Sequence, residues 1–163
     1  MAFVPIEGVE ETDEEGKSRS NRDEAAKVLS VVNDLLAMGD LKPEDIGVIS
    51  PYNGQVRELV RLFEMAGGRE PGQPYAGLEI KSVDGYQGRE KEVIVFSTVR
   101  ANERGEVGFL SDYRRLNVAI TRAKRGLILL GHPTTLRHDG TWKSYLDWIE
   151  EHQLFAWHVT HSS

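Results

Sequence analysis

One run of four consecutive apolar residues, Val-Ile-Val-Phe at positions 93–96, constrains the fold more than any other stretch of the chain. A strand with one face in water alternates apolar and polar residues, whereas a strand covered on both faces has a continuous apolar run. Strands of the second kind belong to parallel sheets, in which connecting helices cover both faces. The run therefore predicts a mainly parallel sheet between two layers of helices.

The rest of the chain alternates short apolar runs with apolar residues at helical spacing. We expect strands at residues 46–50, 78–83, 93–99 and 127–130. We expect helices around residues 25–36, 56–66, 112–124 and 141–153. Asn21 and Glu24 have the spacing of a capping pair before the first helix, and Gly39 follows that helix as a stop signal.

This alternation predicts a three-layer α/β/α sandwich, whose ligands bind at the carboxyl ends of the strands. The site is therefore expected after Ile49, Val83, Val99 and Leu130. We divide the chain into an acidic lead-in with an edge strand (1–20), one compact domain (21–153) and a tail (154–163).

The charge is unevenly distributed along the chain. The net charge is −6, but residues 81–130 carry ten basic and six acidic residues. A basic segment in an acidic domain indicates a local anionic ligand, such as nucleotide or nucleic-acid phosphate, and an ordinary solvated charged face is the alternative. The absence of cysteine excludes disulfides, thiolate metal sites and a cysteine nucleophile. No apolar run exceeds four residues, so we expect no membrane span and an intracellular protein.

Two segments concentrate the polar chemistry. The first follows the expected strand at 78–83, and its glycines at 85 and 88 let backbone amides approach a ligand closely. The second is the expected helix at 112–124, where Arg115 and Arg122 are seven residues apart and share one face. Guanidinium groups suit phosphate oxygens. Surface pairing with Asp112 or Glu90 is the alternative for these arginines.

Three ordered stretches carry a resemblance to a known family. Residues 50–55 (SPYNGQ), 82–90 (SVDGYQGRE) and 114–123 (RRLNVAITRA) resemble motifs IV to VI of superfamily 1 helicases of the Upf1-like group. The similarity extends over residues 21–153. It implies the second RecA-like domain of a translocating motor, with a P-loop NTPase-like fold that lacks its own P-loop. It also implies ATP with Mg²⁺ and two partners, which are single-stranded DNA or RNA and a first RecA-like domain.

The resemblance also implies roles for individual residues. Arg122 matches the arginine finger, and Glu90 matches the glutamate that helps to hold the nucleotide at the cleft between the two domains. Further nucleotide-binding positions are Gln87, Gly88 and Arg115. The positions that contact single-stranded nucleic acid, or that position the contacting loops, are Ser50, Tyr52, Asn53, Ser82 and Asp84.

The chain departs from a complete helicase in its phosphate-binding loop. Its Gly-Lys-Ser at 16–18 does not complete the G-x-x-x-x-G-K-[ST] pattern, because position 11, where the pattern needs its first glycine, is Glu11. The neighbouring acidic residues would also repel a triphosphate. The acidic Mg²⁺-binding box is also missing. We therefore expect the isolated chain to be unable to turn over ATP.

Two other functions stay open at this point, and so does the choice between DNA and RNA. One is a catalytically inactive module with a helicase-like fold that binds nucleic acid or protein. The other is a metal-dependent nuclease built on Glu79, Lys81 and Asp45.

Overall fold

The fold is built on a parallel sheet. The computed structural model describes residues 1–86 and 90–154. In this part of the chain the main sheet contains β1 (Ala2–Pro5), β4 (Ile46–Ser50), β5 (Glu79–Ser82), β6 (Lys91–Ser97) and β7 (Ala123–Gly131). Their order is β1-β7-β6-β4-β5, and every neighbouring pair is parallel. The two short strands β2 (Glu11–Thr12) and β3 (Arg19–Ser20) form a separate antiparallel hairpin.

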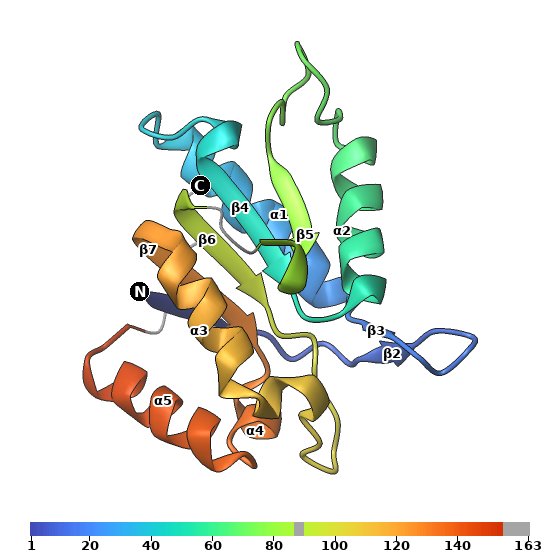
Figure 1. Cartoon of the computed structure of the whole chain (residues 1–163), viewed down its shortest axis with the longest axis vertical. Helices are drawn as coiled ribbons and strands as arrows, with labels where there is room; N and C mark the ends of the chain where they lie inside the picture. The colour runs from blue at the N-terminus through green and yellow to red at the C-terminus, as the bar shows by residue number, and fades with distance from the viewer. Residues whose placement is uncertain (87–89, 155–163) are drawn as a thin grey trace.

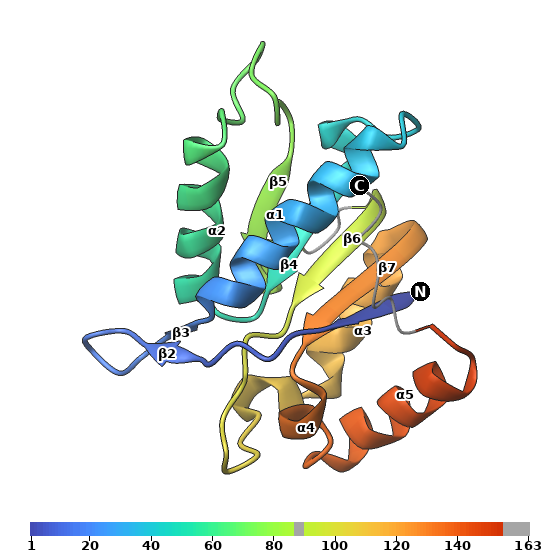
Figure 2. The same cartoon turned by 180° about the vertical axis from the view of Figure 1, so that it is seen from behind.

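Helices cover both faces of the sheet. Helix α1 (Arg22–Ala37) lies behind it in Figure 1 and in front of it in Figure 2, and α2 (Asn53–Met65), drawn beside β5, packs into the same core layer as α1. Helices α3 (Tyr113–Arg122) and α5 (Gly140–Glu151) cover the opposite face. The remaining helical elements are short: η1 (Pro43–Asp45), η2 (Asp84–Tyr86), η3 (Gly108–Ser111) and α4 (Pro133–Leu136). The predicted α/β/α sandwich is confirmed.

The core has one apolar layer on each side of the sheet. In β6, Val93 and Val95 pack into the layer under α1 and α2, whereas Ile94 and Phe96 pack into the layer under α3 and α5. All four side chains are buried. Burial on both sides is the physical reason for the continuous apolar run, because neither face of this strand meets water.

The edge strand expected within residues 1–20 is β1. It pairs with β7, and its Phe3 and Val4 are buried in the two core layers. The expected domain limits at residues 20 and 153 themselves stay predictions.

The hairpin β2–β3 contains the Gly-Lys-Ser triplet that the sequence analysis set aside. Gly16 lies in the hairpin turn at φ 68°, and Lys17 Nζ is 3.3 Å from Glu15 Oε2. The hairpin projects from the body of the molecule (Figure 1). The triplet therefore does not lie in the turn between a strand and a helix that a phosphate-binding loop requires.

The strand expected to reach Val99 ends at Ser97, because Val99 has a left-handed backbone with φ 72°. In α5, Trp142 is buried, whereas Trp148 is 45% exposed and stacks on His152 at 4.3 Å between ring centroids. Among the described residues, no helix has both the length and the apolar character needed to cross a bilayer.

Candidate functional site

Ser50 and Ser82 end neighbouring strands and are partners in the register of the sheet. Ser50 is completely buried, and its Oγ accepts a hydrogen bond from the Tyr52 N–H at 3.3 Å. Tyr52 is also buried, and its hydroxyl donates to the Val107 carbonyl at 3.3 Å. Both side chains are almost completely buried, and their hydrogen bonds fix the turn between β4 and α2. Two roles were predicted for Ser50 and Tyr52, namely contact with single-stranded nucleic acid or positioning of the loops that make the contact. Their burial is compatible with the positioning role.

The other predicted residues at this edge are more accessible. Asn53, the first residue of α2, and Asp84, the first residue of η2, are exposed. Ser82 is half-buried, and its Oγ accepts from the Gly85 N–H at 3.3 Å. These three polar side chains are therefore the ones that the fold presents at the carboxyl edge of β4 and β5.

The left-handed turn at Val99 is held from both sides by the first turn of α1. Glu24 Oε1 accepts from the Val99 N–H at 2.8 Å, and Asn21 Nδ2 donates to the Val99 carbonyl at 3.1 Å. The Asn21 side chain also caps α1, since its Oδ1 accepts from the Glu24 N–H at 3.0 Å. Only this half of the expected capping pair forms. The Glu24 carboxylate turns inward to the turn at Val99 instead of returning to the Asn21 N–H.

Gln55 and Ser97 complete this buried polar cluster. Gln55 Oε1 accepts from the Asn21 N–H at 2.9 Å, and Gln55 Nε2 donates to Ser97 Oγ at 3.0 Å. Ser97 Oγ donates in turn to Glu24 Oε1 at 2.6 Å. Burial raises the pKa of Glu24 to about 7 despite these donors, and its Oε2 has no hydrogen-bond partner in the described residues. The cluster ties α1, α2 and β6 together at the carboxyl edge.

Arg100, which directly follows the Val99 turn, was missed by the sequence analysis. It is only 4% exposed; its Nε lies 3.0 Å from Glu10 Oε1, and its Nη1 donates to the Tyr52 hydroxyl at 3.1 Å. Partial burial opposes ionisation of Glu10, but donors from Asn102, Arg100 and the Ala101 N–H hold its pKa below the usual range. The sequence signal was an arginine three residues after a strand whose central residues, 93–96, are all apolar.

Glu90 and Arg122 lie at the amino ends of neighbouring strands, at the opposite edge of the sheet. β6 and β7 begin with Lys91 and Ala123, which are partners in the sheet, and Glu90 and Arg122 immediately precede them. Helix α3 runs antiparallel to the strands and so brings its last residue to their amino ends (Figure 1). The expectation that all site residues lie at the carboxyl ends is therefore wrong for these two.

The Arg122 side chain is half-buried, and its Nε is buried without a hydrogen-bond partner in the described residues. Glu90 is exposed. A buried donor of a permanently charged guanidinium is costly to leave unsatisfied. Within the part of the chain that the structure describes, the amino edge therefore carries a buried cationic donor without a partner at the start of β7 and an exposed carboxylate at the start of β6. The predicted nucleotide-binding residues Gln87 and Gly88 lie outside the described residues.

Arg115 and Arg114 lie two turns earlier in α3. The Arg115 guanidinium carbon lies 4.9 Å from the ring centroid of Phe109, at the carboxyl edge, and so away from the Glu90 end of α3. Its predicted nucleotide contact stays a prediction. Arg114 is exposed, and its Nε lies 3.0 Å from Asp112 Oδ1, the helix-capping residue. Arg114 thus pairs with Asp112 at the surface, whereas the surface-pairing alternative was stated for Arg115 and Arg122.

Comparison with known proteins identifies the family. Residues 1–134 match a family described as AAA domain. Regulator of nonsense transcripts 1 homolog of Drosophila melanogaster is 44% identical over 96% of this chain, and ATP-dependent helicase NAM7 of Saccharomyces cerevisiae is 44% identical over 90%. An uncharacterized ATP-dependent helicase of Methanocaldococcus jannaschii is 43% identical over 94%. The chain belongs to the Upf1-like family of superfamily 1 helicases.

The chain corresponds to only one part of a Upf1-like helicase. The chain spans 13% of the Drosophila relative, 15% of the yeast relative and 21% of the archaeal relative. The RecA-like sandwich seen here is thus the AAA domain of a Upf1-like helicase, and the relatives are several times longer.

Proposed function

We propose that this chain is the second RecA-like domain of an ATP-dependent motor that moves along single-stranded DNA or RNA inside the cell. In this proposal the first RecA-like domain holds ATP, and Arg122 reaches the triphosphate across the seam between the domains. A guanidinium in that place stabilises the negative charge that spreads over the γ-phosphoryl oxygens during transfer. Glu90, with Gln87 and Gly88, lines the same seam.

The observation that supports this proposal is the placement of Arg122 and Glu90 at the amino ends of two neighbouring strands. The Arg122 Nε, which is buried without a hydrogen-bond partner in the described residues, is compatible with a guanidinium that binds an external acceptor. A triphosphate supplies such acceptors in abundance, so the residues present fit the nucleotide.

Magnesium belongs to the other half of this proposed site. Among residues 1–86 and 90–154, no three histidine or acidic side chains gather as a metal site would require. The Mg²⁺ that accompanies ATP would therefore be held by the first domain, where it neutralises phosphate charge. This chain would supply Arg122 and the closing surface.

The nucleic-acid grip is proposed for the opposite edge. Asn53, Ser82 and Asp84 present polar groups there, and the buried Ser50 and Tyr52 shape the turn that carries Asn53. Separate edges for nucleotide and strand allow ATP-driven closure of two domains to change the hold on the strand.

The geometry does not support the nuclease alternative. Glu79 Oε1 lies 3.3 Å from Lys91 Nζ, so this carboxylate is already paired with a cation. Asp45 Oδ2 accepts from the Lys42 N–H and stabilises η1. The other alternative is an inactive binding module. It differs from a motor domain in that it would not restore ATP hydrolysis when joined to a first RecA-like domain.

A chimaera tests the proposal. This chain would replace the matching segment of yeast NAM7, to which it is 44% identical over 146 residues. We expect the chimaera to hydrolyse ATP in a strand-dependent manner, and we expect the isolated chain to show no turnover because it lacks a phosphate-binding loop. Turnover by the isolated chain that is lost in Arg122→Ala would contradict the division of labour. An inactive but folded chimaera that still binds the strand would favour the binding module.

A further inference from the structure

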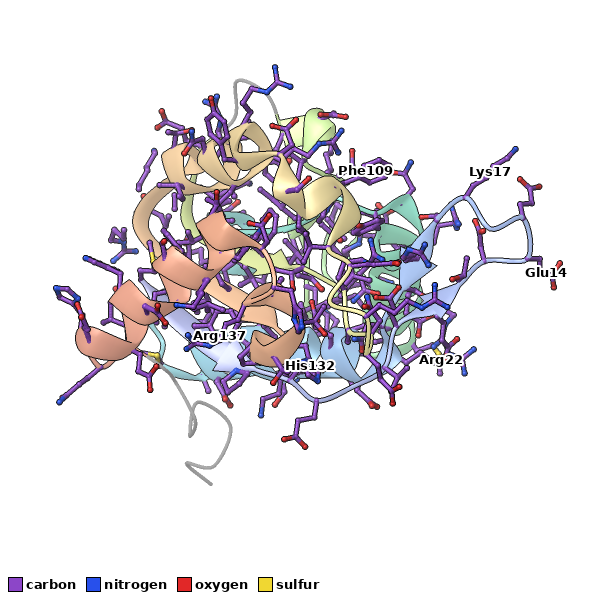
Figure 3. All side chains as sticks on the ribbon, turned by 90° about the horizontal axis from the view of Figure 1, so that it is seen from below. Glu14, Lys17, Arg22, Phe109, His132 and Arg137 are labelled. Atoms are coloured by element: carbon purple, nitrogen blue, oxygen red, sulfur yellow. The ribbon has the colours of Figure 1, made fainter. Side chains whose placement is uncertain are left out.

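A groove at the carboxyl edge extends from Asn53 toward the β2–β3 hairpin. It has a volume of about 800 Å³ and lies between the β2–β3 hairpin and the turn η3. Pro51, Tyr52 and Phe109 supply its apolar surface, and Asn53 and Arg57 of α2 line it as well. Figure 3, which views this edge, shows Phe109 on the side of the molecule from which the hairpin with Glu14 and Lys17 projects.

Phe109 is unusual because a large apolar ring is held rigidly while it stays open to solvent. The side chain is 51% exposed, and its ring stacks on Tyr52 with centroids 5.4 Å apart and planes 29° apart. Tyr52 is fixed by its hydrogen bonds to the Val107 carbonyl and from Arg100. The adjacent Gly108 leaves no space for a side chain, since a Cβ there would lie 2.9 Å from the Tyr52 hydroxyl. The exposed ring therefore rests on a buried, hydrogen-bonded tyrosine.

The charges around this groove largely cancel. Asp13 Oδ2 lies 3.9 Å from Arg57 Nη2, and Glu15 Oε2 lies 3.3 Å from Lys17 Nζ, which leaves Glu14 as the unbalanced charge among the lining residues. The Arg115 guanidinium, 4.9 Å from the Phe109 ring centroid, offsets it. A groove of this kind does not attract a polyanionic backbone. It suits a flat, uncharged ring whose amino groups can donate hydrogen bonds to the carboxylates. A nucleic-acid base has this chemistry.

We propose that Phe109 is a stacking platform for one base of a single strand lying at the carboxyl edge. This inference rests on the proposed function and adds to it a base-binding position beside the Asn53 end of α2. Stacking on an aromatic ring tolerates any base, because every base has a π face. The Phe109 platform thus holds a moving strand without reading its sequence.

Direct binding to the chain tests the platform without ATP. Fluorescence anisotropy would measure the affinity of the wild-type chain, Phe109→Ala and Phe109→Tyr for a short labelled single-stranded RNA and for the matching DNA. We expect Phe109→Ala to weaken binding roughly 5- to 150-fold, because stacking contributes about 1–3 kcal/mol per base. Phe109→Tyr keeps the ring and should bind as the wild type does. Met65→Ala, which truncates another exposed apolar side chain at the far end of α2, should leave the affinity unchanged.

An abasic oligonucleotide distinguishes stacking from a change in the loop. Removing the bases should weaken wild-type binding, and Phe109→Ala should then cause no further loss. The salt dependence of binding should be equal in both proteins, since no phosphate contact is removed. The proposal is overturned if the wild-type chain binds no single strand, if Phe109→Ala matches the wild type, or if the loss persists on the abasic strand. It is also overturned if only a lysine-rich peptide binds in a Phe109-dependent manner.

The outcome is independent of the ATPase experiment. Loss of strand affinity in Phe109→Ala together with an inactive chimaera would retain the platform and refute the motor. An active chimaera with unchanged Phe109→Ala affinity would retain the motor and refute the platform.

Discussion

A single residue, Val99, decides how the carboxyl edge is built. A left-handed backbone costs a β-branched residue on the order of 1–2 kcal/mol, so a φ of 72° must be imposed by its surroundings. Asn21 and Glu24 impose it by binding the Val99 carbonyl and N–H respectively. The turn then directs Arg100 beneath Tyr52, which supports Phe109. Buried polar side chains thus determine the shape of an exposed groove.

The Glu24 carboxyl should make stability depend on pH in an identifiable window. Burial raises its pKa from 4.5 to about 7, so between these values the folded protein keeps a proton that the unfolded chain has lost. The free energy of unfolding should therefore fall as the pH rises from 4.5 to 7, by on the order of 3 kcal/mol from this group. Glu24→Gln cannot titrate and should remove this contribution. Urea unfolding of both proteins across the window checks it, and equal pH slopes for the two would contradict it.

At the scale of elements, the loop from Thr98 to the start of α3 is the part that could not be predicted. The strands and helices follow from apolar spacing, because burial on one or two faces leaves a local trace in the sequence. The partners of this loop lie far away in the chain: Glu24 is 75 residues from Val99, and Glu10 is 90 residues from Arg100. Such pairings leave no periodic signal. For the same reason Ser50 and Tyr52 could be assigned to the edge but not to its buried layer.

Glycine at position 108 should be required for packing as well as for its backbone. Gly108 has φ 55°, and a Cβ there would overlap Arg100 Nη1; Gly16 has a similar φ of 68° but nothing within 4 Å of its Cβ position. Gly16→Ala should therefore cost only the backbone strain of about 1–2 kcal/mol. Gly108→Ala should lower the free energy of unfolding by about 1–3 kcal/mol more, because it also overpacks the loop.

Urea unfolding of these two variants, compared with the wild-type chain, separates the two contributions. Equal destabilisation of Gly108→Ala and Gly16→Ala would show that the contact with Arg100 is unimportant.

At the scale of the whole molecule, the sheet separates two candidate sites. The parallel strands place Asn53, Ser82 and the Phe109 groove at the carboxyl edge, and the antiparallel course of α3 brings Arg122 to the amino edge. The family resemblance assigned roles to these residues, which stay predictions, but the spacing in the sequence did not show that α3 divides them between two edges. Arg115 and Arg122 share a helix face, yet Arg115 lies at the Phe109 end and Arg122 at the Glu90 end.

The rate of ATP hydrolysis by the NAM7 chimaera carrying Arg122→Ala tests the central claim most directly. Arg114→Ala is the matched control, because Arg114 is on the same helix but pairs with Asp112 at the surface. We predict that Arg122→Ala lowers turnover roughly 10³-fold or more while ATP still binds, since the lost charge acts on the transferred phosphoryl group. Arg114→Ala should stay near the unmutated rate. Equal turnover in Arg122→Ala and the unmutated chimaera would contradict the account.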